Sequence, residues 1–91
     1  LSKLIMVVTF LVREDHFKEG DILSTMNDPV ALALKERLAL SPFKGDLVAV
    51  GEDEVFLVRD NKCYLANYNF EKFYTPQPGK FRTLTLKFRE V

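Results

Sequence analysis

The stretch NDPVALALKERL, residues 27–38, decides the fold of this 91-residue chain. Asn27 or Asp28 can cap the N-terminus of a helix, and Pro29 suits the first helical position, where its missing N–H has no intrahelical partner to lose. An unbroken apolar run over residues 30–34 follows. A surface helix normally carries a polar stripe. The start of this helix is therefore either buried in the core of the protein or offered to a partner.

The helix is predicted over residues 29–40, because Pro42 disfavours a helical residue at Ser41. If its start is exposed, Val30, Leu32 and Leu34 form an interaction surface for an unknown partner protein or for a second copy in a homodimer. Burial within the monomer is the alternative that we favour, because a helix start without a polar face is usually covered on all sides.

The flanking segments predict strands. In residues 4–12 both alternating faces of the expected strand are apolar. This pattern is typical of a central strand covered on both sides. Residues 13–25 predict a connector pinned to the core by Phe17, Ile22 and Leu23.

Short strands are predicted over residues 47–50, 55–58 and 63–65. The pair Asp60-Asn61 suits the tight turn between the last two, because both residues tolerate positive φ. A single helical turn is predicted over residues 70–74, capped by Asn67 or Asn69. Residues 83–89 then alternate cleanly, which predicts a strand with Leu84, Leu86 and Phe88 on the buried face.

This order of elements predicts a single α+β domain over residues 1–91. One main helix packs on a mixed or antiparallel sheet of about five strands, and a short second helix is added. The run 4–12 is too short to span a bilayer, so we expect no membrane segment there.

Charge is unevenly distributed although the formal net charge is zero. The zero balance argues against attraction of the whole molecule to nucleic acid or an anionic membrane. Residues 59–91, however, hold seven Lys or Arg and only three Asp or Glu. Basic residues interleaved with aromatics can bind single-stranded nucleic acid, and the candidates here are Lys80, Arg82, Lys87, Arg89 and Tyr74. Arg82 should face away from Lys87 and Arg89, because strand residues alternate between faces.

Few residues suggest catalysis. His16 is the only histidine and Cys63 the only cysteine. A lone histidine among acidic residues does not make a metal site, and nothing in the sequence brings His16 and Cys63 together. We therefore expect no metal, no cofactor and no enzymatic activity. A single cysteine also favours a reducing cytoplasm over secretion.

The sequence resembles a group of small uncharacterised bacteriophage and prophage proteins of α+β type. The shared features are Gly20-Asp21, the helix start Pro-Val-Ala-Leu-Ala-Leu at residues 29–34, and Leu84-Thr85-Leu86. The group often has Cys before the proline where this chain has Asp28, so a thiol-based role does not carry over. The resemblance implies a phage-encoded chain in the host-cell cytoplasm, and it implies no particular activity.

Taken together, these features predict a small non-enzymatic accessory protein that acts through protein–protein interaction, in the simplest version with itself. The alternative is a module that binds single-stranded nucleic acid through its basic C-terminal third.

Overall fold

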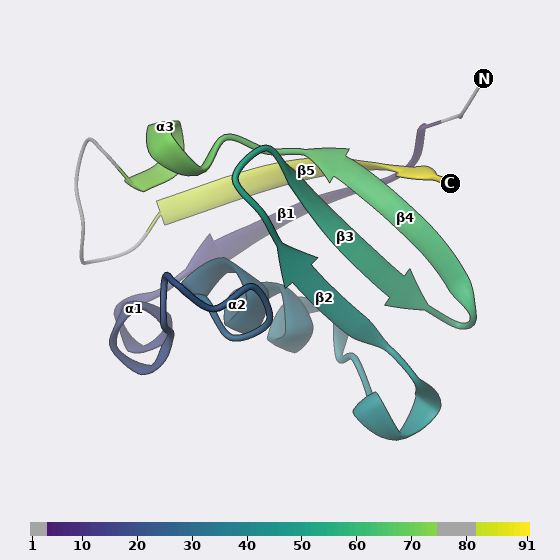
Figure 1. The fold of residues 1–91 in the computed structure, drawn as a ribbon, viewed down its shortest axis with the longest axis horizontal. Helices are drawn as coiled ribbons and strands as arrows, with labels where there is room; N and C mark the ends of the chain where they lie inside the picture. The colour runs from purple at the N-terminus through teal and green to yellow at the C-terminus, as the bar shows by residue number, and fades with distance from the viewer. Residues whose placement is uncertain (1–3, 75–81) are drawn as a thin grey trace.

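The computed structural model describes residues 4–74 and 82–91 (Figure 1). In chain order they form β1 (Leu4–Val12), α1 (Glu14–Glu19), α2 (Pro29–Leu38), the 3-10 turn η1 (Pro42–Lys44), β2 (Leu47–Val50), β3 (Glu54–Arg59), β4 (Lys62–Asn67), α3 (Phe70–Tyr74) and β5 (Arg82–Glu90). The strands make one sheet in the order β1-β5-β4-β3-β2, and every pair is antiparallel. The predicted α+β fold is confirmed, with an antiparallel rather than a mixed sheet.

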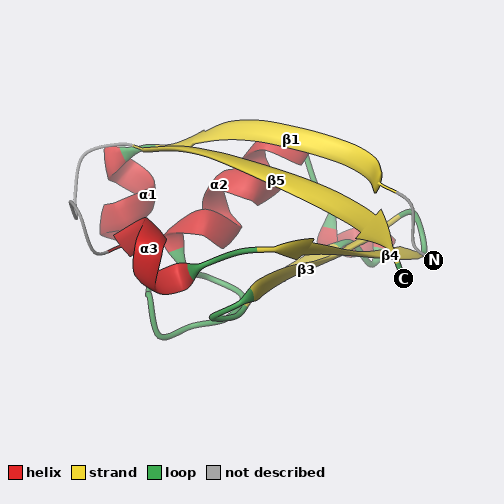
Figure 2. Cartoon of the chain, turned by 90° about the horizontal axis from the view of Figure 1, so that it is seen from above, coloured by secondary structure: helices red, strands yellow, loops and turns green. Residues whose placement is uncertain are grey.

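The sheet curls around α2. Figure 2 shows α2 between β1 on one side and β3 on the other, and the helix contacts both edge strands, β1 and β2. The inner face of the sheet and the helix therefore share one hydrophobic core, in which each fully buried Leu, Val or Phe contributes about 1.5–3 kcal/mol. Its members include Val8, Phe10, Val12, Val30, Leu34, Val48, Leu57, Leu86 and Phe88.

The α2 helix begins as the sequence predicts. Asp28 is the N-cap, and its Oδ1 accepts a hydrogen bond of 2.6 Å from the N–H of Ala31. The helix ends two residues before the predicted position, because Ala39 adopts the left-handed conformation, with a φ of 51°. Val30 and Leu34 are fully buried in the monomer and Leu32 is partly buried. The alternative of burial within the monomer is thus confirmed for Val30 and Leu34. Their side chains are not accessible to a partner protein.

β1 is an edge strand, and the prediction of a central strand covered on both sides is wrong. Among the described strands its only partner is β5, and its inner face packs on α2. On the outer face, Ile5, Val7 and Leu11 are 50%, 53% and 42% exposed. An apolar run favours a strand in either position, so the pattern alone does not fix which neighbours the strand has.

The connector after β1 contains a helix, α1, that was not predicted from the sequence. α1 begins where the N–H of Arg13 donates to Nδ1 of His16 over 2.9 Å, a side-chain cap that replaces a missing helical bond. Phe17 packs against the core as predicted, but Ile22 and Leu23 are 51% and 90% exposed, so they are not anchors. Backbone bonds such as that from Asp21 N–H to the Asn27 carbonyl hold this loop instead.

The remaining local predictions are confirmed. Asp60 and Asn61 have φ values of 53° and 63° in the turn between β3 and β4. Oδ1 of Asn69 accepts a hydrogen bond from the N–H of Lys72 at the start of α3. In β5, Leu86 and Phe88 are buried and Leu84 is partly buried, whereas the alternate residues from Thr83 to Arg89 are exposed.

Candidate functional site

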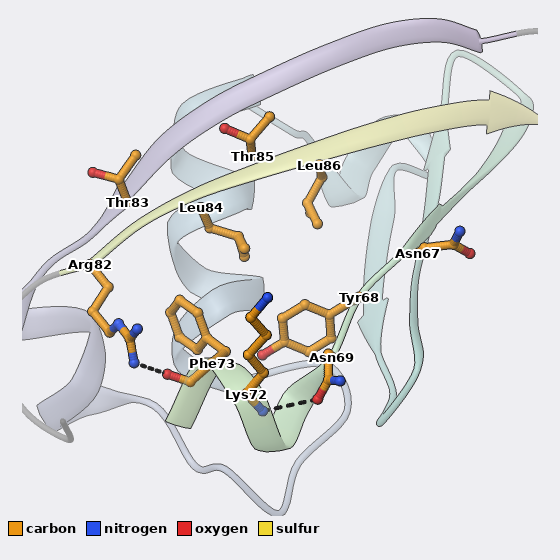
Figure 3. Close-up of a pocket in the computed structure, with 10 residues that line it drawn as sticks. All are labelled: Asn67, Tyr68, Asn69, Lys72, Phe73, Arg82, Thr83, Leu84, Thr85 and Leu86. Atoms are coloured by element: carbon orange, nitrogen blue, oxygen red, sulfur yellow. Dashed lines mark hydrogen bonds between the residues drawn. The ribbon is translucent and has the colours of Figure 1, made fainter. Parts of the chain in front are cut away.

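The candidate site is a cleft of about 470 Å³ where β4 and β5 separate (Figure 3). The two strands pair only from Tyr64–Ala66 to Phe88–Glu90. Beyond that point the chain follows the loop before β3, since Tyr68 N–H donates to the Asp53 carbonyl and Phe70 N–H to the Glu52 carbonyl. α3 then turns away from β5, and a gap opens beside the first half of that strand. The cleft is lined by Asn67, Tyr68, Asn69, Lys72, Phe73, Arg82, Thr83, Leu84, Thr85 and Leu86.

The apolar part of the lining is firmly held. Phe73 belongs to a cluster of aromatic rings, with centroid distances of 6.1 Å to Tyr68, 6.3 Å to Phe17 and 5.0 Å to Tyr74. Aromatic pairs at such distances add about 0.5–1.5 kcal/mol each beyond the area that they bury. This cluster fixes α3 against α1 and the core, so the wall of the cleft opposite β5 is preformed.

The polar part of the lining is positively charged. Arg82 donates from its guanidinium to the Phe73 carbonyl, and the guanidinium carbon lies 5.1 Å from the centre of the Phe73 ring. In Figure 3 the Lys72 side chain extends from α3 in the direction of β5. Neither cation makes an ion pair with any residue of the described ranges, and the described lining contains no carboxylate. The cleft therefore offers two uncompensated positive charges to an anionic group.

The backbone of β5 is open toward the cleft. Val91 N–H donates to the Cys63 carbonyl over 3.0 Å, which shows that odd-numbered residues here direct their backbone groups toward β4. N–H and C=O groups point the same way at every second residue of an antiparallel strand. Thr83 and Thr85 thus point their N–H and C=O groups into the gap, where the described part of the chain supplies no partner.

Tyr68, Tyr74 and Asp28 hold their polar groups buried or half-buried. The Tyr68 hydroxyl is buried and has no hydrogen-bond partner among the described residues. The Tyr74 hydroxyl donates to Oδ2 of Asp28. Burial raises the pKa of Asp28 to about 6, and burial together with the Asp28 carboxylate raises the pKa of both tyrosines. Of these residues only Tyr68 lines the cleft, and its hydroxyl is buried, so we assign all three a structural role.

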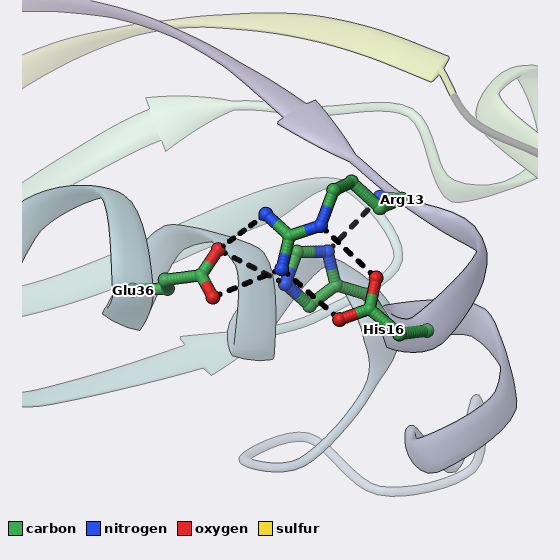
Figure 4. A network of polar contacts seen from close by, with 4 residues as sticks. Arg13, His16 and Glu36 are labelled. Atoms are coloured by element: carbon green, nitrogen blue, oxygen red, sulfur yellow. Dashed lines mark hydrogen bonds and ion pairs between the residues drawn. The ribbon is translucent and has the colours of Figure 1, made fainter.

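A second polar cluster joins α1 to α2 (Figure 4). Arg13 binds Glu36 through two hydrogen bonds of 2.7 and 3.0 Å and binds Asp15 through two of 3.0 Å. His16 is buried, with its Nε2 3.3 Å from Glu36. The Arg13 hydrogen bonds lower the pKa of both carboxylates and hold both in the charged form. Every acceptor in the cluster is already engaged, so the cluster fastens the two helices together.

Residues 4–74 and 82–91 contain no group of three His, Cys, Asp or Glu placed to hold a metal ion.

The residues expected from the sequence to bind nucleic acid do not form one surface. Arg82 lies in the cleft, whereas Lys87 and Arg89 are exposed on the opposite face of the sheet, as the alternation predicts. Tyr74 is half-buried against Asp28, and Lys80 lies outside the described residues. Lys72, Thr83 and Thr85 could not be predicted as site residues, because a lysine on a short helix and threonines on a solvated strand face carry no pattern that distinguishes them. Cys63 is half-buried on β4.

Comparisons with protein-family models, curated proteins and solved structures find no match to this chain. The resemblance to phage-type proteins therefore stays a prediction. Within the described ranges, no helix is long and apolar enough to cross a membrane.

Proposed function

We propose that this protein is a non-enzymatic interaction module whose cleft binds an extended, acidic segment of another polypeptide by strand addition to β5. The observation that carries the proposal is the open backbone edge of β5. An extended peptide can satisfy the N–H and C=O groups of Thr83 and Thr85 in the way that strand-binding domains use a free sheet edge. From Thr83 to Thr85 this edge spans about 7 Å at roughly 3.3 Å per residue, and a peptide of about six residues extends past both ends of it.

The charge of the lining supports an acidic ligand. Lys72 and Arg82 stand on opposite walls of the cleft, and its described lining places no carboxylate between them. A peptide carboxylate that pairs with either cation forms a charge-assisted hydrogen bond, which contributes roughly twice as much as a neutral one. A basic peptide would place like charges in the same space.

The composition of the cleft supports a binding role rather than catalysis. Its described lining has no histidine, cysteine or carboxylate. Histidine and carboxylates are the most common general acids and bases, and cysteine is a common nucleophile. A cytoplasmic location and an accessory role of the phage-protein kind belong to the same proposal, the first on the strength of the lone Cys63.

Peptide binding tests the proposal. The probe is a fluorescently labelled peptide of about six alternating Glu and Val residues with blocked ends, compared with its Lys and Val counterpart. We expect the acidic peptide to bind and the basic one to bind much more weakly. Lys72→Glu should weaken binding of the acidic peptide about tenfold, or about 1.4 kcal/mol. Lys62→Glu, at the distant start of β4, is the matched control and should leave binding unchanged. Equal binding of both peptides, or equal effects of both variants, would overturn the proposal.

Backbone methylation tests the mode of binding. N-methylation at every second residue removes the N–H groups of one peptide edge and leaves those of the other edge intact. One of the two possible methylated series should abolish binding while the other retains it, because only one edge pairs with β5. Equal loss or equal retention in both series contradicts strand addition.

A single-stranded oligothymidine probe tests the alternative function, the binding of single-stranded nucleic acid. Binding of the oligonucleotide that weakens steeply with salt and is sensitive to Lys72→Glu, with no peptide binding, would replace this proposal by nucleic-acid binding. Peptide binding without oligonucleotide binding supports the interaction module.

A further inference from the structure

The free edge of β1 is a second open backbone surface, independent of the cleft. Even-numbered residues of β5 direct their backbone groups toward β1, since the odd-numbered ones face β4. The pairs Val8–Leu86 and Phe10–Leu84 are therefore the hydrogen-bonded ones. It follows that Val7, Thr9 and Leu11 direct their N–H and C=O groups away from β5, where the described residues provide no partner.

From Met6 to Val12 this edge lacks the features by which natural proteins protect a sheet edge. Such edges usually carry a charged residue or a proline, or they are very short or covered. β1 spans nine residues, and none of them is charged or a proline. An irregularity at Ile5 interrupts only the start of its pairing with β5. The opposite edge, β2, is four residues long, and its Val50 N–H is already bonded to the Thr25 carbonyl.

The side chains beside this edge are apolar and accessible. Val7 and Leu11 are among the most exposed large apolar residues of the sheet, and they point to the outer face that α2 does not cover. A strand added beside β1 would cover part of both side chains as well as the backbone. The edge is therefore suited to a neutral, apolar strand rather than to the acidic segment that fits the cleft.

We propose that this strand is β1 of a second copy of the chain, paired antiparallel about a twofold axis beside Thr9. In this register Thr9 faces its own counterpart, and Val7 faces Leu11 of the second copy on both sides of the axis. The regular part of the edge then forms about six new backbone hydrogen bonds. Two features favour a second copy over an unrelated protein. The edge is complementary to itself under a twofold rotation, and neither the strand nor the whole chain, with a net charge of zero, opposes self-pairing by like charge.

The resulting dimer would be a continuous sheet of two curled halves. The cleft lies on the other side of β5 from β1, so self-pairing leaves both clefts of the dimer open. The inference therefore stands or falls separately from peptide binding.

Sedimentation equilibrium tests the inference on the full chain. We expect reversible self-association at chain concentrations up to about 0.1 mM, with discrete dimers and no larger species. A clean monomer over that range overturns the proposal.

A charge-swap pair tests the site. Val7→Glu with Leu11→Glu places like charges directly opposite each other twice in the dimer, whereas Val7→Glu with Leu11→Lys places opposite charges there. Within the monomer, the glutamate introduced at position 7 faces Lys87 on β5 in both variants. We expect the Glu–Glu variant to dissociate on the order of tenfold more readily than the Glu–Lys variant. Equal association of the two variants would place the interface elsewhere, and circular dichroism checks that both are folded.

A disulfide tests the register. In a Cys63→Ser background, Thr9→Cys should form an intermolecular disulfide under mild oxidation. A hydrogen-bonded antiparallel pair holds its Cα atoms about 5.5 Å apart, within the range that a disulfide needs. Thr85→Cys, whose position faces Thr9 on the inner neighbour β5, is the matched control and should not cross-link. Equal cross-linking of the two variants contradicts the register.

Discussion

The Tyr74 hydroxyl lies 3.4 Å from Oδ2 of Asp28, which joins the C-terminal end of α3 to the N-cap of α2. Asp28 is fully buried and also accepts the hydrogen bond from Ala31 that starts the helix. The main helix and the wall of the cleft thus depend on the same carboxyl group.

Asp28 should make the stability of the protein depend on pH. Burial raises its pKa from the ordinary 3.8 to about 6, so the folded state holds this proton more tightly than the unfolded chain. The contribution to stability is therefore full below pH 3.8 and is lost as the pH rises through about 6. Asp28→Asn keeps a capping oxygen and cannot ionise. We expect urea titrations from about pH 4 to 7 to show a loss of roughly 1–3 kcal/mol in the parent that the variant lacks. Parallel curves for the two proteins would contradict this role.

Glu36 should act in the opposite direction. Its hydrogen bonds to Arg13 lower its pKa from the ordinary 4.5, so its contribution to stability is present above that pH and is lost as the pH falls. Glu36→Gln should lower the melting temperature at about pH 7 and at low salt, with a smaller effect at high salt. Glu14→Gln, which breaks only the exposed pair with Lys18, is the control and should change the melting temperature less. Equal effects would show that the link between α1 and α2 adds nothing.

Gly20 should tolerate no side chain. A Cβ atom there would lie 2.6 Å from the backbone nitrogen of Pro29 and 2.8 Å from the His16 carbonyl oxygen. Gly20→Ala must therefore move α1 away from the start of α2, and we expect a loss of about 1–3 kcal/mol in the free energy of unfolding. At Gly51 the nearest atom to a new Cβ is 3.5 Å away, so Gly51→Ala is the matched control. A similar stability for both alanine variants would refute the close packing at Gly20.

The two buried tyrosines should respond differently to loss of their hydroxyls. Tyr68 buries its hydroxyl without a partner in the described residues, so Tyr68→Phe removes a desolvation cost and should leave stability unchanged or raise it. Tyr74→Phe removes the bond to Asp28 and should lower the free energy of unfolding by about 0.5–1 kcal/mol. Chemical denaturation of both variants checks the contrast, and a loss of stability in Tyr68→Phe would mean that its hydroxyl has a partner.

Features encoded within a few neighbouring residues could be predicted from the sequence. The Asp28-Pro29 start of α2, the turn at Asp60-Asn61 and the alternation of β5 each depend on local conformational preference or on one repeating period. The structure confirms all three. The α1 helix escaped prediction because its cap is a histidine ring rather than one of the usual capping residues.

Features that depend on which strands pair could not be predicted. The exposed face of β1 follows from its place at the edge, and an apolar run gives no information about neighbours. The cleft depends on where β4 leaves β5, which is set by the bonds of Tyr68 and Phe70 to the loop before β3. Arg82 was a candidate for its charge alone, and only the fold brings it to the same cleft as Lys72.

The pairing of β1 with β5 also has a kinetic consequence. Among the described elements β1 comes first and β5 last, so their ladder closes a loop from Val12 to Arg82 and joins residues as far apart as Leu4 and Arg89. Contacts between such distant residues slow folding, because the loop entropy is lost before the contacts form. During synthesis on the ribosome, the uncharged apolar strand β1 would stay unpaired until β5 had been made. We therefore expect slow refolding for a chain of this size, and a strong tendency to aggregate when β5 is deleted.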